Sequence, residues 1–389
     1  MKIAMVVAKF DETGESPYLT NELADALTAR GHHVTVLYVD WHAEAEPKVR
    51  YKPGQTVYVD KPMPRGSGVV AMARKWSLAP LKYLSFQKPL QEEYDLAIYY
   101  SPLFVAYPLI ALNRLKARFR LAVYWDFFPY HQVELGLLPR GPMEKGLHAA
   151  ERFLLGRMNV IALMSAGNRE SFKRVFSWRD DSRLHLLPIW GGGERLALRP
   201  PDEQKYCVFG GQLSPGRNIE ALVRAAEFLP DDIELRVYGR GPLQEALEAI
   251  IGQKQLSNVR LMGQVSREQY QRDIAGAWLG LIITDPHAKT DSFPSKVIDY
   301  FRVALPVLAI TEARSDFGSF VEQTAQAGRA LHSDDPATIA AAITSMIGSP
   351  QREEWGRTGH DYYYAHMTAE RVAERIENLV SAGSGGGHD

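Results

Sequence analysis

The chain has a single cysteine among 389 residues, Cys207 in the apolar run "YCVFGG". One thiol forms no disulfide within the chain, so we expect a protein of the reducing cytoplasm, with Cys207 as a small core residue. The net charge of −1 lacks the basic excess that a nucleic-acid binder needs. The longest apolar run spans only residues 102–112, too few to cross a bilayer. These absences favour a soluble or peripheral protein that does not bind nucleic acid.

Two further signals are missing near the N-terminus. "MKIAMVVAKF" has the pattern of a strand that leads into a polar loop, and not that of a signal peptide. No G-x-G-x-x-G follows this strand, which argues against a dinucleotide-dependent oxidoreductase.

What is present is a repeated alternation of buried strands and amphipathic helices, which predicts an α/β protein with parallel sheets. In the first half we expect strands at 2–8, 32–39, 95–101, 120–126 and 159–165, with helices at 17–31 and 142–157. In the second half we expect strands at 205–211, 233–239, 259–264, 279–284 and 306–310, with helices at 217–229, 242–251, 266–276 and 295–303.

The pattern predicts two doubly wound, Rossmann-like domains. The expected regions are an N-terminal domain (1–192), a linker (193–204), a second domain (205–349), a helical tail that packs back toward the first domain (350–381) and a disordered end (382–389). Open α/β sheets bind ligands at the carboxyl ends of their strands, so the candidate sites are sought there.

Glycines follow two strands of the second domain. In "VFGGQLSPGRNIEAL", Gly210 and Gly211 let a ligand approach the backbone, and Arg217 could bind a phosphate. An ordinary strand–turn–helix connection explains the same residues equally well. Gly239 and Gly241, in "VYGRGPL", are more typical of a structural turn.

The stretch "TDSFPSKVIDYFRVALPVLAI" has two interpretations. Pro294 places Asp291 in a loop and Asp299 in the helix that follows. Lys296, Asp299 and Arg302 share a polar strip, which is either an exposed ion-pair ladder or a site where Lys296 holds a phosphate and Asp299 binds ribose hydroxyls. The opposite, core-facing side is expected to contain Val297, Phe301 and Leu305.

The first domain offers two candidates. Asp126 ends a strand among aromatic residues, where it could orient a sugar hydroxyl or cap the next turn. Residues 61–91 carry cations without an acid, interleaved with aromatic and aliphatic side chains. This composition suits an anionic membrane surface, and it equally suits a solvated loop beside a core helix. The cations are Lys61, Arg65, Arg74, Lys75, Lys82 and Lys88.

Taken together, these stretches resemble GT-B glycosyltransferases of family 4, in particular the bacterial branch that builds O-antigen, lipopolysaccharide, capsule and exopolysaccharide. The resemblance covers nearly the whole chain. It rests on "YSPLFVAYPLIAL", on "WDFFPYHQVELGLLP", on the Ser292–Lys296 sequence and on the helix, proline and strand that follow.

The resemblance implies a retaining hexosyltransferase that uses a nucleotide-diphosphate sugar, UDP favoured over GDP, and a lipid-linked or free saccharide acceptor. It implies no cofactor and no metal, and the chain contains no Asp-x-Asp. It also implies contact with the inner face of the cytoplasmic membrane. Three departures from the family pattern stand out: Asp291 and Asp299 replace two glutamates, Gln212 takes an arginine position, and Arg217 takes a lysine position.

Specific residues carry these roles by resemblance. The catalytic set is Asp126, Asp291, Arg217 and Lys296. The donor-binding set is Gly14, Gly210, Gly211, Gln212, Arg217, Asn218, Gly239, Gly241, Phe293, Ser295, Lys296 and Asp299. The acceptor and membrane set is Arg74, Lys75, Trp76, Lys82 and Tyr130. Two alternatives stay open: a nucleotide-sugar 2-epimerase of the same architecture, and a non-catalytic scaffold that binds sugar or lipid.

Overall fold

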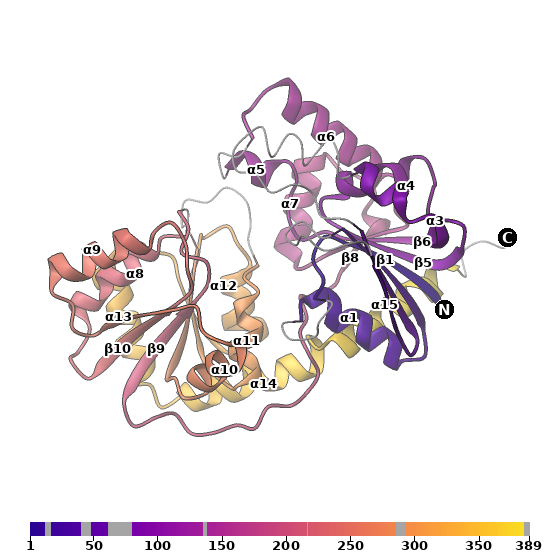
Figure 1. The fold of residues 1–389 in the computed structure, drawn as a ribbon. Coiled ribbons are helices and arrows are strands. Elements are labelled where there is room, and N and C mark those ends of the chain that lie inside the picture. Colours follow the sequence, from indigo (N-terminus) through magenta and orange to yellow (C-terminus); the bar gives the residue numbers. More distant parts are fainter. Residues whose placement is uncertain are drawn as a thin grey trace. The chain divides into compact units, whose positions relative to one another are not determined.

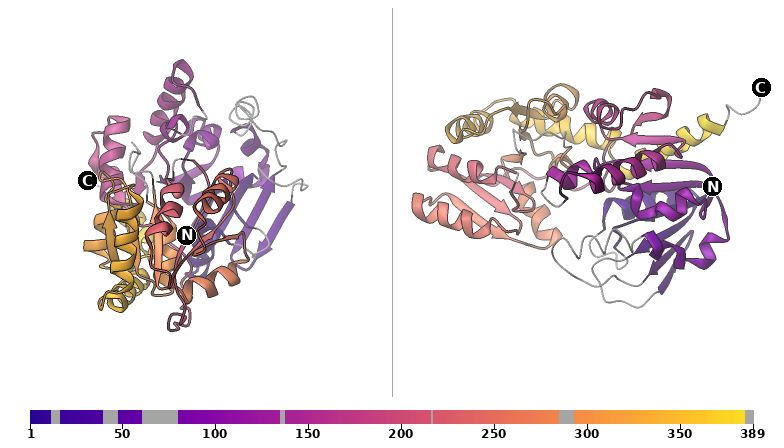
Figure 2. Two further views of the ribbon diagram at one scale, coloured as in Figure 1. Left: turned by 90° about the vertical axis from the view of Figure 1, so that its left-hand side faces the viewer. Right: turned by 90° about the horizontal axis from the view of Figure 1, so that it is seen from above.

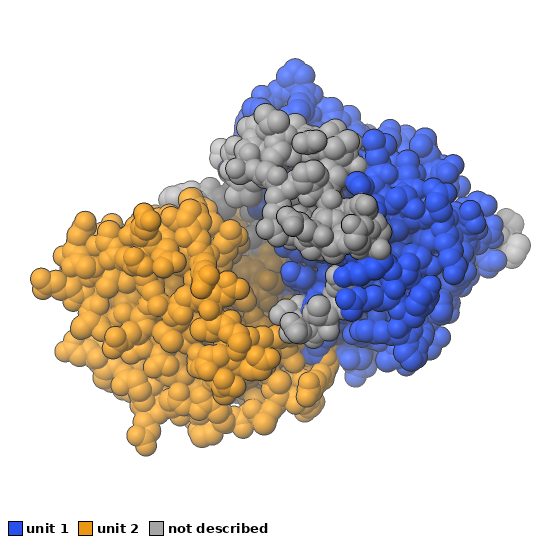
Figure 3. Space-filling model, viewed as in Figure 1, with its two compact units in different colours: residues 1–192, 369–389 blue, residues 193–368 orange. Residues whose placement is uncertain are grey.

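The computed structural model describes residues 1–11, 17–39, 48–60, 80–134, 138–215, 217–284 and 293–384. The chain forms two compact units (Figures 1 and 3). Unit 1 comprises residues 1–192 and 369–389, and unit 2 comprises residues 193–368. Unit 1 is therefore built from both ends of the chain. Each described helix is too short or too polar to cross a bilayer.

Unit 1 contains an eight-stranded sheet with the order β3-β4-β2-β1-β5-β6-β7-β8. Only β3 runs antiparallel, against β4, and the other neighbours pair in parallel. The strands are β1 (Lys2–Val7), β2 (His33–Val39), β3 (Lys48–Lys52), β4 (Gln55–Asp60), β5 (Glu93–Tyr100), β6 (Lys116–Val123), β7 (Val160–Leu163) and β8 (Leu184–Leu186).

Helices cover both faces of this sheet (Figures 1 and 2). The central strands are buried on both sides, as a parallel sheet between helical layers requires. The helices are α1 (Leu19–Ala29), α3 (Gln87–Leu90), α4 (Tyr107–Ala111), α5 (Tyr130–Glu134), α6 (Pro142–Leu155), α7 (Ala166–Phe176) and α15 (Ala369–Ser384). Short 3-10 turns are η1 (Tyr83–Ser85), η2 (Leu103–Ala106) and η3 (Asp181–Arg183).

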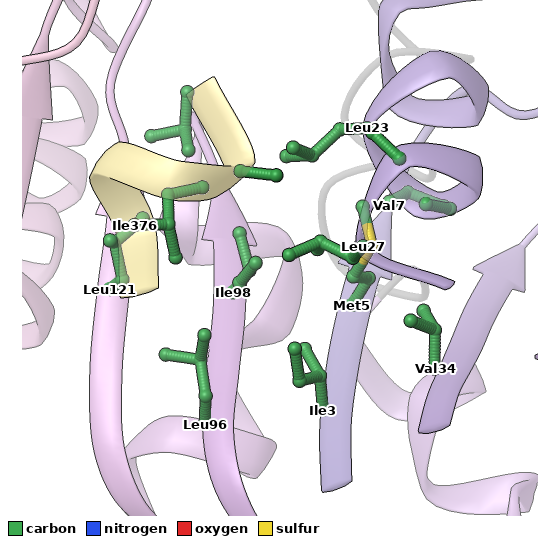
Figure 4. Packing of buried hydrophobic residues seen from close by; sticks show 14 of the residues in the cluster. Ile3, Met5, Val7, Leu23, Leu27, Val34, Leu96, Ile98, Leu121 and Ile376 are labelled. Atoms are coloured by element: carbon green, nitrogen blue, oxygen red, sulfur yellow. The ribbon is translucent and has the colours of Figure 1, made fainter. Parts of the chain in front are cut away.

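Helix α15 completes the core of unit 1 although it comes last in the sequence. Its Ile376 packs among residues of α1, β5 and β6, including Leu27, Ile98 and Leu121 (Figure 4). Beside this apolar contact, Arg30, which immediately follows α1, donates two hydrogen bonds to the Glu377 carboxylate, at 2.7 and 2.6 Å. The arginine lowers the pKa of Glu377 to about 2.

Unit 2 contains a six-stranded parallel sheet with the order β11-β10-β9-β12-β13-β14. Its strands are β9 (Lys205–Gly210), β10 (Ile233–Tyr238), β11 (Val259–Gly263), β12 (Leu279–Ile283), β13 (Val307–Ile310) and β14 (Gly328–Leu331). Its helices are α8 (Ile219–Ala225), η4 (Ala226–Phe228), α9 (Gln244–Lys254), α10 (Arg267–Ala275), α11 (Lys296–Arg302), α12 (Phe317–Ser319), η5 (Phe320–Thr324), α13 (Pro336–Ile347) and α14 (Arg352–His366).

The expectation of two doubly wound, Rossmann-like domains is confirmed by these two sheets. Sequence reasoning missed the β3–β4 hairpin, because β3 is exposed and lacks an apolar run. It also missed β14 and α13. Residues 193–204, expected as a linker, lie in unit 2, where the carbonyl of Glu194 accepts a hydrogen bond from Tyr364 at 2.9 Å. The expected helical tail divides into α14 in unit 2 and α15 in unit 1.

Gly239 shows how closely the backbones of unit 2 approach one another. It has φ of +134°, and a Cβ built on it would lie 1.8 Å from the carbonyl oxygen of Gly211. A Cβ on Gly241 would lie 2.1 Å from the Leu213 carbonyl oxygen. The glycines after β10 therefore let the loop after β9 pack against it.

We predict that Gly239→Ala lowers the free energy of unfolding by about 2 kcal/mol or more, because the methyl group would overlap a carbonyl that is held on both sides. Gly252→Ala is the control, since Gly252 lies within α9 with open space around it. The control should raise stability by about 0.5–1 kcal/mol. Urea unfolding measures the stability of both variants. If Gly239→Ala were as stable as the wild type, the close approach of Gly239 to the Gly211 carbonyl would be contradicted.

Candidate functional site

The strand order of unit 2 defines a switch point between β9 and β12. From β9 the chain proceeds to β10 and β11 on one side, and then returns to β12, β13 and β14 on the other. In a doubly wound sheet the loops diverge at this place and leave room for a ligand at the carboxyl ends of the two strands. The loop after β9 and the segment before α11 are therefore the first place to look for a site.

Helix α11 is anchored directly over this switch point. The hydroxyl of Tyr300, which is fully buried, lies 3.2 Å from the carbonyl oxygen of Val208 in β9 and 3.2 Å from that of Leu281 in β12. Gly280 makes room for the ring, because a Cβ there would lie 2.6 Å from the Tyr300 side chain. Tyr300 thus fixes where the polar residues of α11 lie relative to both strands.

Lys296 and Asp299 lie on the solvent-accessible side of α11. The Lys296 ammonium is 3.1 Å from a carboxylate oxygen of Asp299, and both side chains are partly exposed. An exposed pair of this kind contributes at most about 1 kcal/mol to stability. The Lys296 ammonium also lies 5.0 Å from the centroid of the Tyr270 ring.

Arg302 was expected on the same strip, and this prediction is wrong. Its side chain is only 5% exposed, and it donates a hydrogen bond to the Glu194 carbonyl at 3.4 Å. A spacing of six residues turns an α-helix by about 240°, so Arg302 lies well away from Lys296 around the helix. The expected inward positions of Val297, Phe301 and Leu305 are confirmed.

Two other residues expected at the donor site occupy different environments. Ser295 is exposed immediately before α11. The ring of Phe293 is 8% exposed and packs against Phe317 and Phe320, each with its centroid 5.0 Å away. The Phe293 ring therefore anchors the start of α11 in the core.

The loop after β9 presents an unpaired cation. Arg217 is exposed, and it forms no ion pair or hydrogen bond with any described residue. Its guanidinium lies 3.9 Å from the position that a Cβ of Gly211 would take. Gln212 is exposed beside it. The side-chain nitrogen of Asn218 is buried without a hydrogen-bond partner in the part of the chain that the structure describes.

Gly210 is required for packing by a residue that sequence reasoning missed. A Cβ on Gly210 would lie 2.1 Å from the hydroxyl of Tyr270, a residue of α10. Burial raises the pKa of Tyr270 well above its ordinary value, so the phenol stays neutral. Tyr270 thereby connects the end of β9 with Lys296 on α11. Its contact with Gly210 spans sixty positions, so no local pattern could have revealed it.

An acid that was also missed lies beside the switch point. Glu312 follows β13 and is 1% exposed. One of its carboxylate oxygens accepts a hydrogen bond of 2.6 Å from the hydroxyl of Thr284, which follows β12. The adjacent Thr311 is also buried. These side chains make the carboxyl edge of unit 2 polar between β12 and β13.

In unit 1 the ends of β5 and β6 are joined by Ser101. Its hydroxyl oxygen accepts hydrogen bonds from the backbone N–H groups of Trp125, at 3.0 Å, and Asp126, at 3.1 Å. The Asp126 side chain is exposed, and its carboxylate forms no hydrogen bond or ion pair with a described residue. Within the described ranges it therefore does not cap the following turn, and it remains available to a ligand.

Aromatic rings surround this strand end. The ring of Trp125 lies 5.3 Å from that of Tyr100 and 5.2 Å from that of Trp190, between centroids. The ring of Tyr130 is half-buried and stands edge-on to His148 at 5.5 Å. Lys82 is partly exposed before η1. Five expected site residues, Gly14, Arg74, Lys75, Trp76 and Asp291, lie outside the described residues.

A comparison with family models finds a match to the region that contains the second sheet. Residues 204–349 match the family described as "Glycosyl transferases group 1". This range contains β9 to β14 and all the switch-point side chains described above. The matched range lies within unit 2 and covers less than half of the chain.

The chain as a whole is similar to known proteins at low sequence identity. It is 20% identical over 398 residues to the Escherichia coli (strain K12) protein named as a colanic acid biosynthesis glycosyl transferase, WcaI, with 95% of this chain and 96% of that protein covered. Sucrose-phosphate synthase from Thermosynechococcus elongatus superposes with a TM-score of 0.75 at 16% identity, with 98% of each chain covered. HepE from Anabaena, solved with UDP and glucose, superposes with a TM-score of 0.68 at 14% identity, with 98% and 100% covered. The expected GT-B fold is confirmed.

Outside the matched range, unit 1 contains a buried acid that sequence reasoning missed. Glu151 of α6 is 0% exposed. Its two carboxylate oxygens accept hydrogen bonds from the backbone N–H groups of Leu103 and Phe104, both at 2.8 Å. Burial raises the pKa of Glu151 from 4.5 to about 7, although the two N–H groups and the Tyr124 hydroxyl favour the charged form.

This pKa makes stability depend on pH in a defined direction. Between about pH 4.5 and 7 the folded protein keeps a proton on Glu151 that the unfolded chain releases. The stability contributed by this group is therefore present below pH 4.5 and is lost as the pH rises through 7. Relative to Glu151→Gln, the wild type should lose about 2–3 kcal/mol of unfolding free energy between pH 5 and pH 8. Urea unfolding at both pH values measures this, and a difference independent of pH would contradict it.

Proposed function

We propose that this protein is a glycosyltransferase that moves a sugar from a nucleotide-diphosphate donor to a saccharide acceptor. The observation that carries the proposal is the switch point of the matched range, where the unpaired Arg217 and the partly exposed Lys296 lie at the carboxyl ends of β9 and β12. Two cations beside a glycine loop suit a diphosphate. UDP is the favoured nucleotide, supported by the UDP in the HepE complex.

In the proposed mechanism, the bond between the sugar's anomeric carbon and the diphosphate oxygen breaks as an acceptor hydroxyl bonds to that carbon. The hydroxyl proton leaves with the diphosphate. As the bond breaks, negative charge develops on the diphosphate before that proton reaches it, and Arg217 and Lys296 would stabilise this charge without reorganisation of water. Asp299 would bind the ribose hydroxyls, with Lys296 released from it to the phosphate. We further propose that configuration is retained, as the resemblance to family 4 implies.

For the acceptor we propose a saccharide at the carboxyl ends of β5 and β6 in unit 1. Asp126 presents an exposed carboxylate there, and Trp125 and Tyr130 provide aromatic surface. The expected acceptor is lipid-linked, in the synthesis of a cell-surface polysaccharide or glycoconjugate. The name of the WcaI relative, which refers to colanic acid, supports this class.

Nucleotide binding tests the donor site first. UDP, GDP and dTDP are added in turn, and at about 100 times its dissociation constant the correct nucleotide should raise stability by roughly 2.7 kcal/mol. Arg217→Ala and Lys296→Ala should each weaken its binding about 10- to 100-fold, because each removes a charge-assisted hydrogen bond. Asp299→Ala should abolish the stabilisation at the same nucleotide concentration. Thermal shift and calorimetry provide the measurements.

Arg224→Ala is the matched control, since Arg224 is exposed in the last turn of α8 and carries the same charge. It should leave nucleotide binding unchanged. If no nucleotide stabilises the wild type, Lys296 and Asp299 form only a surface ion pair, and the non-catalytic scaffold replaces the enzyme as the better proposal.

We also propose that unit 1 contacts an anionic membrane surface. Besides the basic stretch of residues 61–91, the described part of α6 exposes Met143 and Phe153 at 50% and 46%, next to exposed Lys145 and Arg152. Apolar side chains that enter the headgroup region beside cations are the pattern of interfacial binding.

Neutralising Arg74, Lys75, Lys82 and Lys88 together should weaken binding to anionic vesicles at least tenfold, since each cation near such a surface contributes about 1 kcal/mol. Vesicle sedimentation at low and high salt measures this. Neutralising four exposed cations of unit 2, Arg224, Lys254, Arg260 and Arg357, is the control and should have little effect. Equal binding by all variants would refute the membrane contact.

A further inference from the structure

The buried Glu151 carboxylate has no role in donor binding, yet its contacts lead to the acceptor side of unit 1. It forms no ion pair with any described residue, so its charge is balanced only by hydrogen-bond donors, which are two backbone N–H groups and the Tyr124 hydroxyl. A buried carboxylate without a cation costs stability. Its contribution must therefore lie in what it holds in place, which is the first turn of η2.

That turn is connected to the acceptor side by one residue. Leu103 and Phe104, whose N–H groups Glu151 binds, begin η2 two residues after Ser101. Ser101 is itself fixed to β6, because its N–H donates to the Val123 carbonyl at 3.0 Å. The Ser101 hydroxyl then binds the backbone N–H groups of Trp125 and Asp126. Four hydrogen bonds between backbone and side chain thus join α6 to the end of β6.

We propose that Glu151 is a positioning residue: its buried carboxylate holds the first turn of η2 and, through Ser101, fixes the backbone that presents Trp125 and Asp126 to a saccharide acceptor. This inference rests on the proposed function for the identity of the ligand, although the chain of contacts does not. A carboxylate is needed because its two oxygens accept from two parallel N–H groups. A glutamine would accept only one of them and would place an NH₂ group against the other.

Hydrogen exchange tests the contacts on the whole chain without a ligand. Glu151→Gln should speed exchange about tenfold at the Leu103 and Phe104 amides and also at the Trp125 and Asp126 amides. Glu144→Gln is the matched control, because Glu144 lies on the same helix and accepts a backbone N–H from Gly141 at 3.2 Å. The control should leave the exchange rates of all four amides unchanged. Faster exchange at Leu103 and Phe104 alone would overturn the coupling to Asp126.

Ser101→Ala provides a second, independent variant in case Glu151→Gln does not fold. It removes the acceptor for the Trp125 and Asp126 amides while the Glu151 contacts remain. Exchange at those two amides should again rise about tenfold, and an unchanged rate would overturn the proposal.

Kinetics with UDP-glucose as donor and octyl β-glucoside as acceptor test the consequence. Glu151→Gln and Ser101→Ala should each raise the acceptor KM or lower kcat at least tenfold, with the donor KM unchanged. The double variant should be no worse than the more impaired single variant, because both act through one path. Additive losses or a raised donor KM would overturn the proposal.

Failure of the proposed function is a different result. In that case the wild type would bind no nucleotide and transfer no sugar, whereas hydrogen exchange would still show whether Glu151 holds Trp125 and Asp126. An active wild type with unaltered Glu151→Gln kinetics would refute the positioning role alone.

Discussion

The parallel pairing of β9 with β12 is the constraint on which the candidate donor site depends. Leu279, Gly280 and Leu281 of β12 align with Cys207, Val208 and Phe209 of β9, and the chain leaves these strands in opposite directions. The hydroxyl of Tyr300 is shared between a carbonyl of each strand, which fixes α11 over the pair. A helix held in this way keeps the backbone of Lys296 and Asp299 in one position, even where their partly exposed side chains move.

Close packing around this pairing explains the glycines better than a ligand does. Gly210 admits Tyr270, Gly239 admits the Gly211 carbonyl and Gly280 admits Tyr300. None of these contacts needs a nucleotide, so the glycine pattern alone does not identify one. The more specific signal is electrostatic: Arg217 has no ion-pair partner among the described residues, and the ion pair between Lys296 and Asp299 is partly exposed and weak.

Unit 1 also has a sheet whose strand order diverges from a central strand, but different residues position its candidate site. Its parallel strands also diverge on the two sides of β1, and the ends of β5 and β6 lie together because the strands pair along their full length. Here the positioning elements are Ser101 and Glu151, not a tyrosine beneath a helix. The sheet also needs α15 from the far end of the chain, whose apolar face covers β5 and β6 (Figure 4).

The sequence by itself determined the alternation of strands and helices, the two Rossmann-like sheets, and the inward face of α11. These features follow from apolar periodicity and from turn residues, which act over a few neighbouring positions. Only the tertiary structure decided the burial of Arg302 against Glu194 and the meeting of Tyr270 with Gly210 and Lys296. The tertiary structure also decided the buried position of Glu151, whose contact with Leu103 spans 48 positions. Such contacts depend on which elements the sheet order brings together, and no local pattern records that order.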